Sequence, residues 1–166
     1  MLKTRYEIVR QEPFMCVPAT IQMILKRRGI SFPMTQREIG LALGWAEKTG
    51  TQIQKPEFEP NKIFAQIGLP LSFEYIPISK IASSQELVKI INEIIAAGDD
   101  AVICWKVERR NGHVAAVDKI DDEAIRYVCT DCGGRIIEQS TEYIYGQMKE
   151  HTDAMMGGVW VFRSKN

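Results

Sequence analysis

Residues 11–29 read QEPFMCVPATIQMILKRRG and carry some of the clearest helix start and stop signals of the chain. Pro18 fits only the first turn of a helix, and the apolar side chains after it recur at helical spacing until Gly29. Three basic residues precede that glycine, where the negative end of a helix dipole attracts cations. The stretch therefore predicts an amphipathic helix that begins near Cys16.

A thiol at the start of this helix faces unpaired backbone N–H groups and the positive end of the helix dipole, and both favour the thiolate form. Cys16 is therefore the leading candidate for a nucleophile that attacks carbonyl groups, with Gln11 five residues upstream. The alternative is that Cys16 is a small buried hydrophobic residue, as most cysteines of intracellular domains are.

A cysteine nucleophile needs a base, and the sequence holds two histidines. Residues 114–120 and 124–131 are typical of two antiparallel strands joined by a turn. If the turn is centred near Asp122, His113 lies opposite Asp131, and such facing residues have Cβ atoms about 4.5–5.5 Å apart. The carboxylate can then hold the imidazole as in a catalytic triad. A shift of one residue would place the two side chains on opposite faces.

Each of these residues also has a purely structural interpretation. Asp131 can be an ordinary turn residue at a strand end, and His113 can simply open a strand after the Asn111-Gly112 turn. The second histidine, His151, lies in a polar stretch near a predicted helix end, where a solvated side chain is expected. It is the fallback base. Loss of His113 should abolish activity, whereas loss of His151 should have a mild effect.

At these residues the sequence resembles the papain-like cysteine peptidases, whose functional residues follow one another as Gln, Cys, His and then Asp or Asn. Within that group it is most similar to the bacteriocin-processing peptidases, which remove double-glycine leaders, and to their stand-alone relatives. The resemblance is carried by RQEPFMCVPATIQMIL, TQREIGLALG, NGHVAAVDKI, YVCTDCGGR and STEYIYGQM. It implies a papain-like α+β fold in which the nucleophile helix packs on a C-terminal antiparallel sheet.

The same resemblance implies roles for four residues. Cys16 would be the nucleophile, His113 the general base and acid, and Asp131 the orienting carboxylate. Gln11 would donate its side-chain amide, together with the backbone N–H of Cys16, to the developing oxyanion.

Two positions depart from the family pattern. Val17 stands where these peptidases usually have Gly after the nucleophile, and Cys132 stands where they usually have Pro after the Asp. The gap between Gln11 and Cys16 is also slightly short. The β-branched Val17 is a candidate for crowding the cleft beside the thiol.

The other cysteines do not favour a metal or redox site. Cys104 falls in the apolar run AVICW and is expected to be buried in a central strand. Cys129 and Cys132 form a Cys-x-x-Cys, but a zinc site needs about four ligands and a second pair is absent. A thioredoxin-like pair should open a helix, whereas Gly133-Gly134 indicates a turn. We expect no metal and no cofactor, although a disulfide of Cys129 and Cys132 would alter the triad.

Length and composition favour one domain over residues 1–166. With 45% hydrophobic residues, the chain is long enough for one buried core and too short for two ordinary domains. Lys plus Arg and Asp plus Glu both number 21, so neither nucleic acid nor an anionic membrane is expected as a partner. The sequence has no apolar run long enough for a membrane span and no secretion signal at its start. The expected location is the cytoplasm, unless the chain is one domain of a longer protein.

Helical signals dominate the first half of the chain and strand signals the second. Capping boxes at Thr35 and Ser83 predict two further helices, and Asn61 is predicted to cap a third. Residues 45–60 are predicted to form an irregular loop that is a candidate border of the cleft. Strands are predicted over residues 71–78, 101–107, 113–120, 124–130, 135–139 and 158–163, and a helix over residues 141–149. This segregation favours an α+β fold with a helical layer on an antiparallel sheet.

The function that these residues favour is cleavage of a peptide or protein substrate. Cys16 would attack the carbonyl, His113 would protonate the leaving amine, and water would then release the acid from a thioester. A transpeptidase, deamidase or amidase would use the same chemistry. A non-catalytic peptide-binding domain is the third interpretation, and Val17 is its best support.

Overall fold

A computed structural model gives the structure of residues 3–107, 110–131, 133–150 and 155–165. The helices are α1 (Cys16–Arg27), α2 (Gln36–Ala42), α3 (Pro60–Ile67), α4 (Ser84–Ala96) and α5 (Thr141–Glu150), with short 3-10 helices η1 (Pro56–Phe58) and η2 (Ile78–Lys80). The strands are β1 (Leu71–Pro77), β2 (Asp100–Val107), β3 (Arg110–Ile120), β4 (Ala124–Cys129), β5 (Arg135–Ser140) and β6 (Gly158–Ser164).

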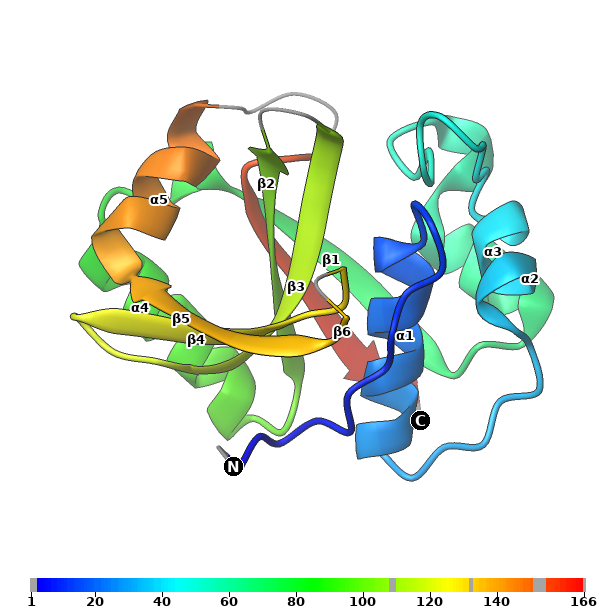
Figure 1. Cartoon of the computed structure of the whole chain (residues 1–166), viewed down its shortest axis with the longest axis horizontal. Coiled ribbons are helices and arrows are strands. Elements are labelled where there is room, and N and C mark those ends of the chain that lie inside the picture. Colours follow the sequence, from blue (N-terminus) through cyan, green and yellow to red (C-terminus); the bar gives the residue numbers. More distant parts are fainter. Residues whose placement is uncertain (1–2, 108–109, 132, 151–154, 166) are drawn as a thin grey trace.

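Within the described residues, the strands form one antiparallel sheet in the order β1-β6-β2-β3-β4-β5. Figure 1 shows α1, α2 and α3 together on one side of the molecule and α4 and α5 on the other. The predicted α+β class, with the first helix packed on an antiparallel sheet, is confirmed. The helices α4 and α5 add a second helical group on the opposite face.

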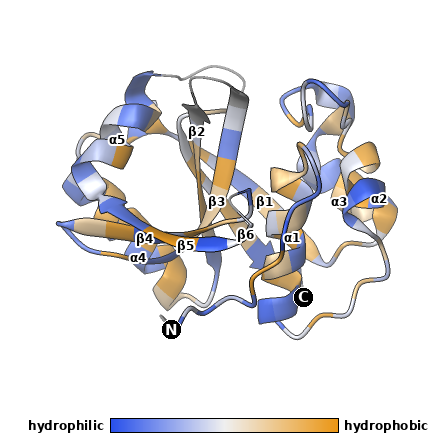
Figure 2. Ribbon diagram, in the orientation of Figure 1, coloured by the Kyte–Doolittle hydropathy of each residue, from blue (hydrophilic) through white to orange (hydrophobic). Residues whose placement is uncertain are grey.

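Alternate residues of β3 contribute to two hydrophobic cores. Val114 and Ala116 pack with the helices of the N-terminal side, whereas Ala115 and Val117 pack with α4 and α5. This follows from the geometry of a strand, in which successive side chains point to opposite faces. Figure 2 shows hydrophobic residues along β3, β4 and α1. The sheet is therefore buried on both faces around β3, the strand that carries His113.

A buried carboxylate fixes the C-terminal end of α1 to the sheet. Asp100, the first residue of β2, is 0% exposed and accepts two hydrogen bonds from Arg27, at 2.6 and 2.7 Å. Arg28 donates at 2.8 Å and the hydroxyl of Tyr6 at 2.9 Å. Burial alone would lower the pKa of Arg27, but the hydrogen bonds and charge of Asp100 raise it. This network sets the position of α1 and hence of the thiol at its other end.

The predicted helix starts are partly confirmed. At α2, Thr35 Oγ1 accepts from the Glu38 N–H at 3.2 Å and Glu38 Oε2 accepts from the Thr35 N–H at 2.7 Å, which is the predicted capping box. The prediction that Asn61 caps α3 is wrong. Glu59 accepts from the Asn61 N–H instead, because a carboxylate before Pro60 also complements the helix dipole. The Asn61 side chain pairs with the backbone of Phe73 and so ties α3 to β1.

Candidate active site

Cys16 is the first residue of α1, and the residue before it does not cap the N–H groups of the first turn with its side chain. Met15 stands at the N-cap position and makes no side-chain hydrogen bond to the first turn. Pro18 in that turn has no N–H of its own. The positive end of the helix therefore faces the thiol without a competing side-chain cap, which is the arrangement that favours an anion at this position.

The turn that leads into Cys16 is tight and strained. The Met15 N–H donates to the Glu12 carbonyl at 3.0 Å. Phe14 has a φ of 61°, a left-handed conformation that is rare for a bulky side chain. Such backbone strain persists only where the surrounding structure enforces it, and it is concentrated at functional sites.

Gln36 and Gly40 of α2 hold this segment in place. The Gln36 side chain is buried, and its Nε2 donates to the Arg10 carbonyl at 2.7 Å while its Oε1 accepts from the Glu12 N–H at 2.9 Å. A Cβ at Gly40 would lie 2.8 Å from the sulfur of Met15, so glycine lets this buried methionine pack against α2. Sequence reasoning missed Gln36, because a glutamine after a capping residue does not indicate which distant backbone it will bind.

His113 is 5% exposed on β3 and is surrounded by side chains from three elements. Its imidazole stands edge-on to Trp105 of β2, with ring centroids 5.1 Å apart and an interplanar angle of 90°. Its Nε2 lies 3.2 Å from the Sγ of Cys129, the last residue of β4. The thiol of Cys16, at the start of α1, lies close enough to the imidazole to raise the pKa of His113. The structure thus brings the thiol of the first helix and the imidazole of the later sheet together.

Opposing effects act on this imidazole. Burial alone would lower the pKa of His113, but hydrogen bonds with Cys129 and Cys16, and the charges of these sulfur atoms, raise it to about 9. The neighbouring sulfur atoms therefore favour the protonated form of the ring, although the ring is buried.

The predicted register of the β3 and β4 hairpin is confirmed. Ala116 faces Val128, and the two residues lie equally far from Asp122 along the chain. A β-bulge interrupts the pairing only on the side of the turn. The contact between His113 and Asp131 that this register implies stays a prediction.

Gln11 and Asp131 meet beyond the end of β4. The Gln11 N–H donates to the Thr130 carbonyl at 3.2 Å, and Thr130 Oγ1 donates to Gln11 Oε1 at 2.9 Å. Gln11 Nε2 donates to Asp131 Oδ1 at 3.3 Å. Since Nε2 carries two hydrogens, one N–H is directed at the carboxylate and the second can serve another acceptor. The side-chain amide of Gln11, the predicted oxyanion donor, thus contacts the carboxylate of Asp131.

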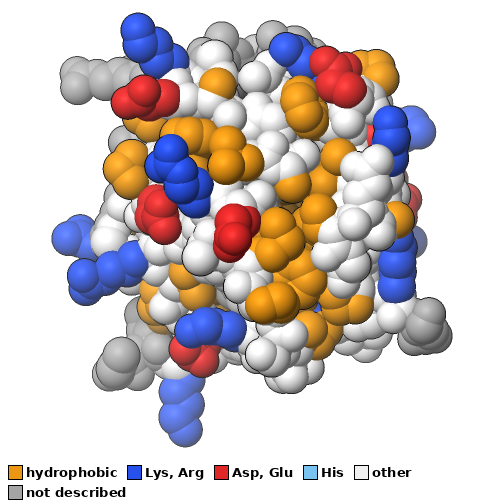
Figure 3. All heavy atoms as spheres, turned by 90° about the vertical axis from the view of Figure 1, so that its right-hand side faces the viewer, with side chains coloured by type: hydrophobic (Ala, Val, Ile, Leu, Met, Phe, Trp, Pro, Cys, Tyr) orange, Lys and Arg blue, Asp and Glu red, His pale blue; other side chains and the backbone are white. Residues whose placement is uncertain are grey.

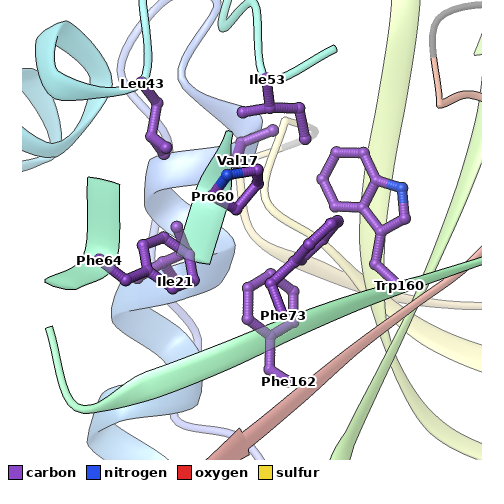
Figure 4. A pocket seen from close by; sticks show the side chains of 9 residues that line it. All are labelled: Val17, Ile21, Leu43, Ile53, Pro60, Phe64, Phe73, Trp160 and Phe162. Atoms are coloured by element: carbon purple, nitrogen blue, oxygen red, sulfur yellow. The ribbon is translucent and has the colours of Figure 1, made fainter. Parts of the chain in front are cut away.

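Val17 packs in the hydrophobic core. It is 6% exposed and lies among the apolar residues that line a small depression beside α1. Figure 4 shows its side chain turned toward Ile53 and Pro60. Ile53 belongs to the predicted loop of residues 45–60, which therefore packs against the first turn of the nucleophile helix.

Hydrophobic side chains are exposed near the start of α1 and on α2. Phe14, two residues before the thiol, is 48% exposed, and Leu41 of α2 is 54% exposed. Figure 3 shows the face that carries α2 and α3, with hydrophobic side chains gathered in its middle and charged side chains around them. Exposed apolar surface of this kind is typical of regions that contact a partner or a ligand.

Cys104 lies apart from these groups. It is 0% exposed, with its Sγ 3.3 Å from the Met155 carbonyl and 3.4 Å from the Gly158 carbonyl. Burial raises the pKa of the Cys104 thiol, which agrees with its predicted lack of chemistry. Cys132 and His151 lie outside the described residues, so the Cys-x-x-Cys and the fallback base stay predictions.

In the described part of the chain, no group of three His, Cys, Asp or Glu side chains is arranged to hold a metal ion. Among the helices of this same part, none combines the length and the hydropathy of a membrane span.

Comparison with solved structures gives a likeness over nearly the whole chain. The peptidase domain of ComA from Streptococcus, a bifunctional ABC transporter involved in quorum sensing, is similar with a TM-score of 0.62. The match covers 97% of this chain and 99% of that domain at 17% sequence identity. No protein-family model and no curated protein matches the sequence. At this identity the likeness shows the fold, and it agrees with the resemblance that the sequence motifs indicated.

Proposed function

We propose that this protein is a cysteine peptidase. The observation that carries the proposal is the proximity of Cys16, at the start of α1, to the buried imidazole of His113 on β3, whose pKa it raises. Burying an ionisable ring is costly, and such groups are concentrated at functional sites. The fold likeness to a peptidase domain supports the same conclusion.

The proposed reaction is acyl transfer to water. The Cys16 thiolate attacks the carbonyl carbon of a peptide bond, and the imidazolium of His113 gives its proton to the leaving amine. The product is a thioester on Cys16. A water molecule then gives a proton to the neutral imidazole and attacks the thioester, which releases the acid and restores the thiolate. We expect this cycle to need no metal or cofactor.

The oxyanion of each tetrahedral intermediate needs donors. We assign them to the backbone N–H of Cys16 and to the Nε2 hydrogen of Gln11 that is not directed at Asp131. Asp131 has two tasks in this proposal. It fixes the Gln11 amide through their hydrogen bond, and its negative charge stabilises and orients the imidazolium of His113.

The proposed substrate is a peptide or a protein segment in extended form. The exposed side chain of Phe14 and the apolar face over α2 and α3 offer contacts to hydrophobic substrate residues. We propose the cytoplasm as the site of action, since Cys16 and Cys104 are free thiols and a reducing compartment keeps such thiols reduced.

Cleavage of a defined peptide mixture tests this function. The mixture includes double-glycine sequences, because the motif resemblance is to peptidases that remove such leaders. We expect products from the native protein, a loss of at least about 10³-fold with Cys16→Ala or His113→Ala, and retention with the buried control Cys104→Ala. Cleavage that survives Cys16→Ala would contradict the proposal.

The same assay separates hydrolysis from the related acyl transfers. In water enriched with ¹⁸O, a peptidase incorporates the label into the new carboxyl group, whereas a transpeptidase yields an unlabelled product joined to an added amine. A non-catalytic peptide-binding domain would bind members of the mixture and release them intact.

A further inference from the structure

Cys129 lies against the candidate base, although the motif resemblance gives it no role. It is the last residue of β4, is 4% exposed, and has its Sγ 3.2 Å from Nε2 of His113. The motifs assign the orientation of this imidazole to Asp131, whose carboxylate accepts a hydrogen bond from Gln11. The side chain that touches the ring from β4 is the thiol of Cys129.

Both neighbouring strands hold the imidazole. Trp105 is the cross-strand partner of His113 on β2 and meets the ring edge-on. Trp105 in turn packs edge-on against Tyr127 of β4, with ring centroids 5.6 Å apart. A rotation of the imidazole would break its contacts with Trp105 and Cys129 inside a packed core, so buried groups determine where Nε2 points.

The position of Nε2 decides which nitrogen serves the nucleophile. An imidazole has two ring nitrogens, and a catalytic base needs one directed at the nucleophile while a second group holds the other. With Nε2 at Cys129, Nδ1 is the nitrogen left to exchange a proton with Cys16. A thiol is a weak partner for a neutral ring, but a hydrogen bond from a cationic ring is charge-assisted and stronger.

We propose that Cys129 is a positioning residue whose Sγ holds Nε2 of His113 so that Nδ1 faces Cys16. It shares this task with the charge of Asp131. The inference rests on the proposed peptidase function and deepens it, because it adds a residue that no motif assigns.

Nitrogen-15 NMR of the His113 ring tests the contact without any substrate. The protein carries Cys16→Ala, which removes the other thiol from the ring, and a His113→Gln spectrum identifies the signals. We expect Cys129→Ala to move the titration midpoint of His113 to lower pH by about one pH unit or more, since burial remains and the favourable partner is lost. Cys129→Ser should restore part of the shift. An unchanged titration and tautomer after Cys129→Ala would overturn the proposal.

Kinetics supply the second readout, with Cys104→Ala as the matched control because Cys104 is a buried cysteine whose sulfur contacts backbone carbonyls. Cys129→Ala should lower kcat/KM by about tenfold or more and move the alkaline limb of its pH profile to lower pH, whereas Cys104→Ala should change neither. If Cys129→Ala lowers kcat/KM without moving its pH profile, the role of Cys129 is purely structural and the proposal is overturned. Slow alkylation of Cys16 in the native protein would contradict the proposed peptidase function itself, so the two failures can be told apart.

Discussion

Gln11 donates a hydrogen bond from its Nε2 to Oδ1 of Asp131 over 3.3 Å, and this contact joins the segment before the nucleophile helix to the residue beyond β4. Two of the four residues that the motifs single out are thereby held to each other. The other two, Cys16 and His113, lie close enough together for the thiol to raise the pKa of the imidazole. Two contacts between the N-terminal segment and the sheet thus assemble the candidate site.

Replacing Gln11 by Ala removes the proposed oxyanion donor. We expect kcat to fall by about 10²- to 10³-fold with little change in KM, because the oxyanion exists only after attack on the carbonyl. Steady-state kinetics on a cleaved peptide measures this. Alkylation of Cys16 forms no oxyanion and should proceed at the native rate in the same variant. A loss confined to KM would contradict the assigned role.

Gln36→Ala leaves the Arg10 carbonyl and the Glu12 N–H without the side chain that binds them. We expect the free energy of unfolding to fall by about 1–3 kcal/mol, the usual effect of unsatisfied buried polar groups. Because this segment leads into Cys16, kcat/KM should fall as well. Gln36→Glu keeps an acceptor for the Glu12 N–H but loses the donor to the Arg10 carbonyl. Its free energy of unfolding should therefore lie between those of the native protein and Gln36→Ala. Urea unfolding curves that coincide for all three proteins would show that Gln36 does not brace the turn.

Asp100→Asn tests the anchor of α1. The carboxylate is buried among Arg27, Arg28 and Arg5, so its loss leaves positive charges uncompensated and should reduce the free energy of unfolding by about 3–5 kcal/mol. Glu74→Gln is the matched control, since Glu74 pairs with Arg163 at the surface and exposed pairs contribute about 0–1 kcal/mol. Urea unfolding measures both. Equal effects of the two substitutions would contradict the anchoring role of Asp100.

The pH dependence follows from the raised pKa of His113, about 9 against an ordinary value of 6.5. The leaving amine needs the proton of this ring, so kcat/KM should fall as pH rises through about 9. The folded chain also binds this proton more tightly than the unfolded chain does. The resulting stability is complete below pH 6.5 and is lost as pH rises toward 9.

Urea unfolding at several pH values, with His113→Gln as reference, measures the second effect. The native protein should lose stability relative to this variant between the two pKa values. A native protein that gains relative stability over that interval would show that the folded state does not retain the proton.

Much of the fold could be predicted because its signals are local. Pro18 and Gly29 mark the ends of the first helix, and the acidic turn near Asp122 indicates that β3 and β4 pair as a hairpin. The capping box of Thr35 and Glu38 is likewise contained within four neighbouring residues. Asn61 was misassigned because Glu59 and Pro60 together form a better helix start, while the Asn61 side chain finds a partner on β1.

The supporting contacts could not be predicted, since they depend on side-chain direction and on distant parts of the chain. Extended from Ala116 and Val128, the register predicts Asp131 opposite His113, and the structure shows the imidazole in contact with Cys129, two residues earlier. Gln36 binds the backbone of the segment before Cys16. Asp100 forms ion pairs with an arginine of the N-terminal segment and an arginine of the first helix. Neither contact has a sequence pattern of its own.

The proposed function requires that His113 activates Cys16, and the rate at which iodoacetamide alkylates Cys16 measures this activation. Mass spectrometry follows Cys16 separately from Cys104 and Cys129 in the native protein and in His113→Ala. We expect native Cys16 to react fast at about pH 6, where an ordinary thiol is almost fully protonated, and His113→Ala to remove this reactivity. A Cys16 that reacts no faster than a free cysteine, or whose rate is unchanged in His113→Ala, would contradict the proposed function.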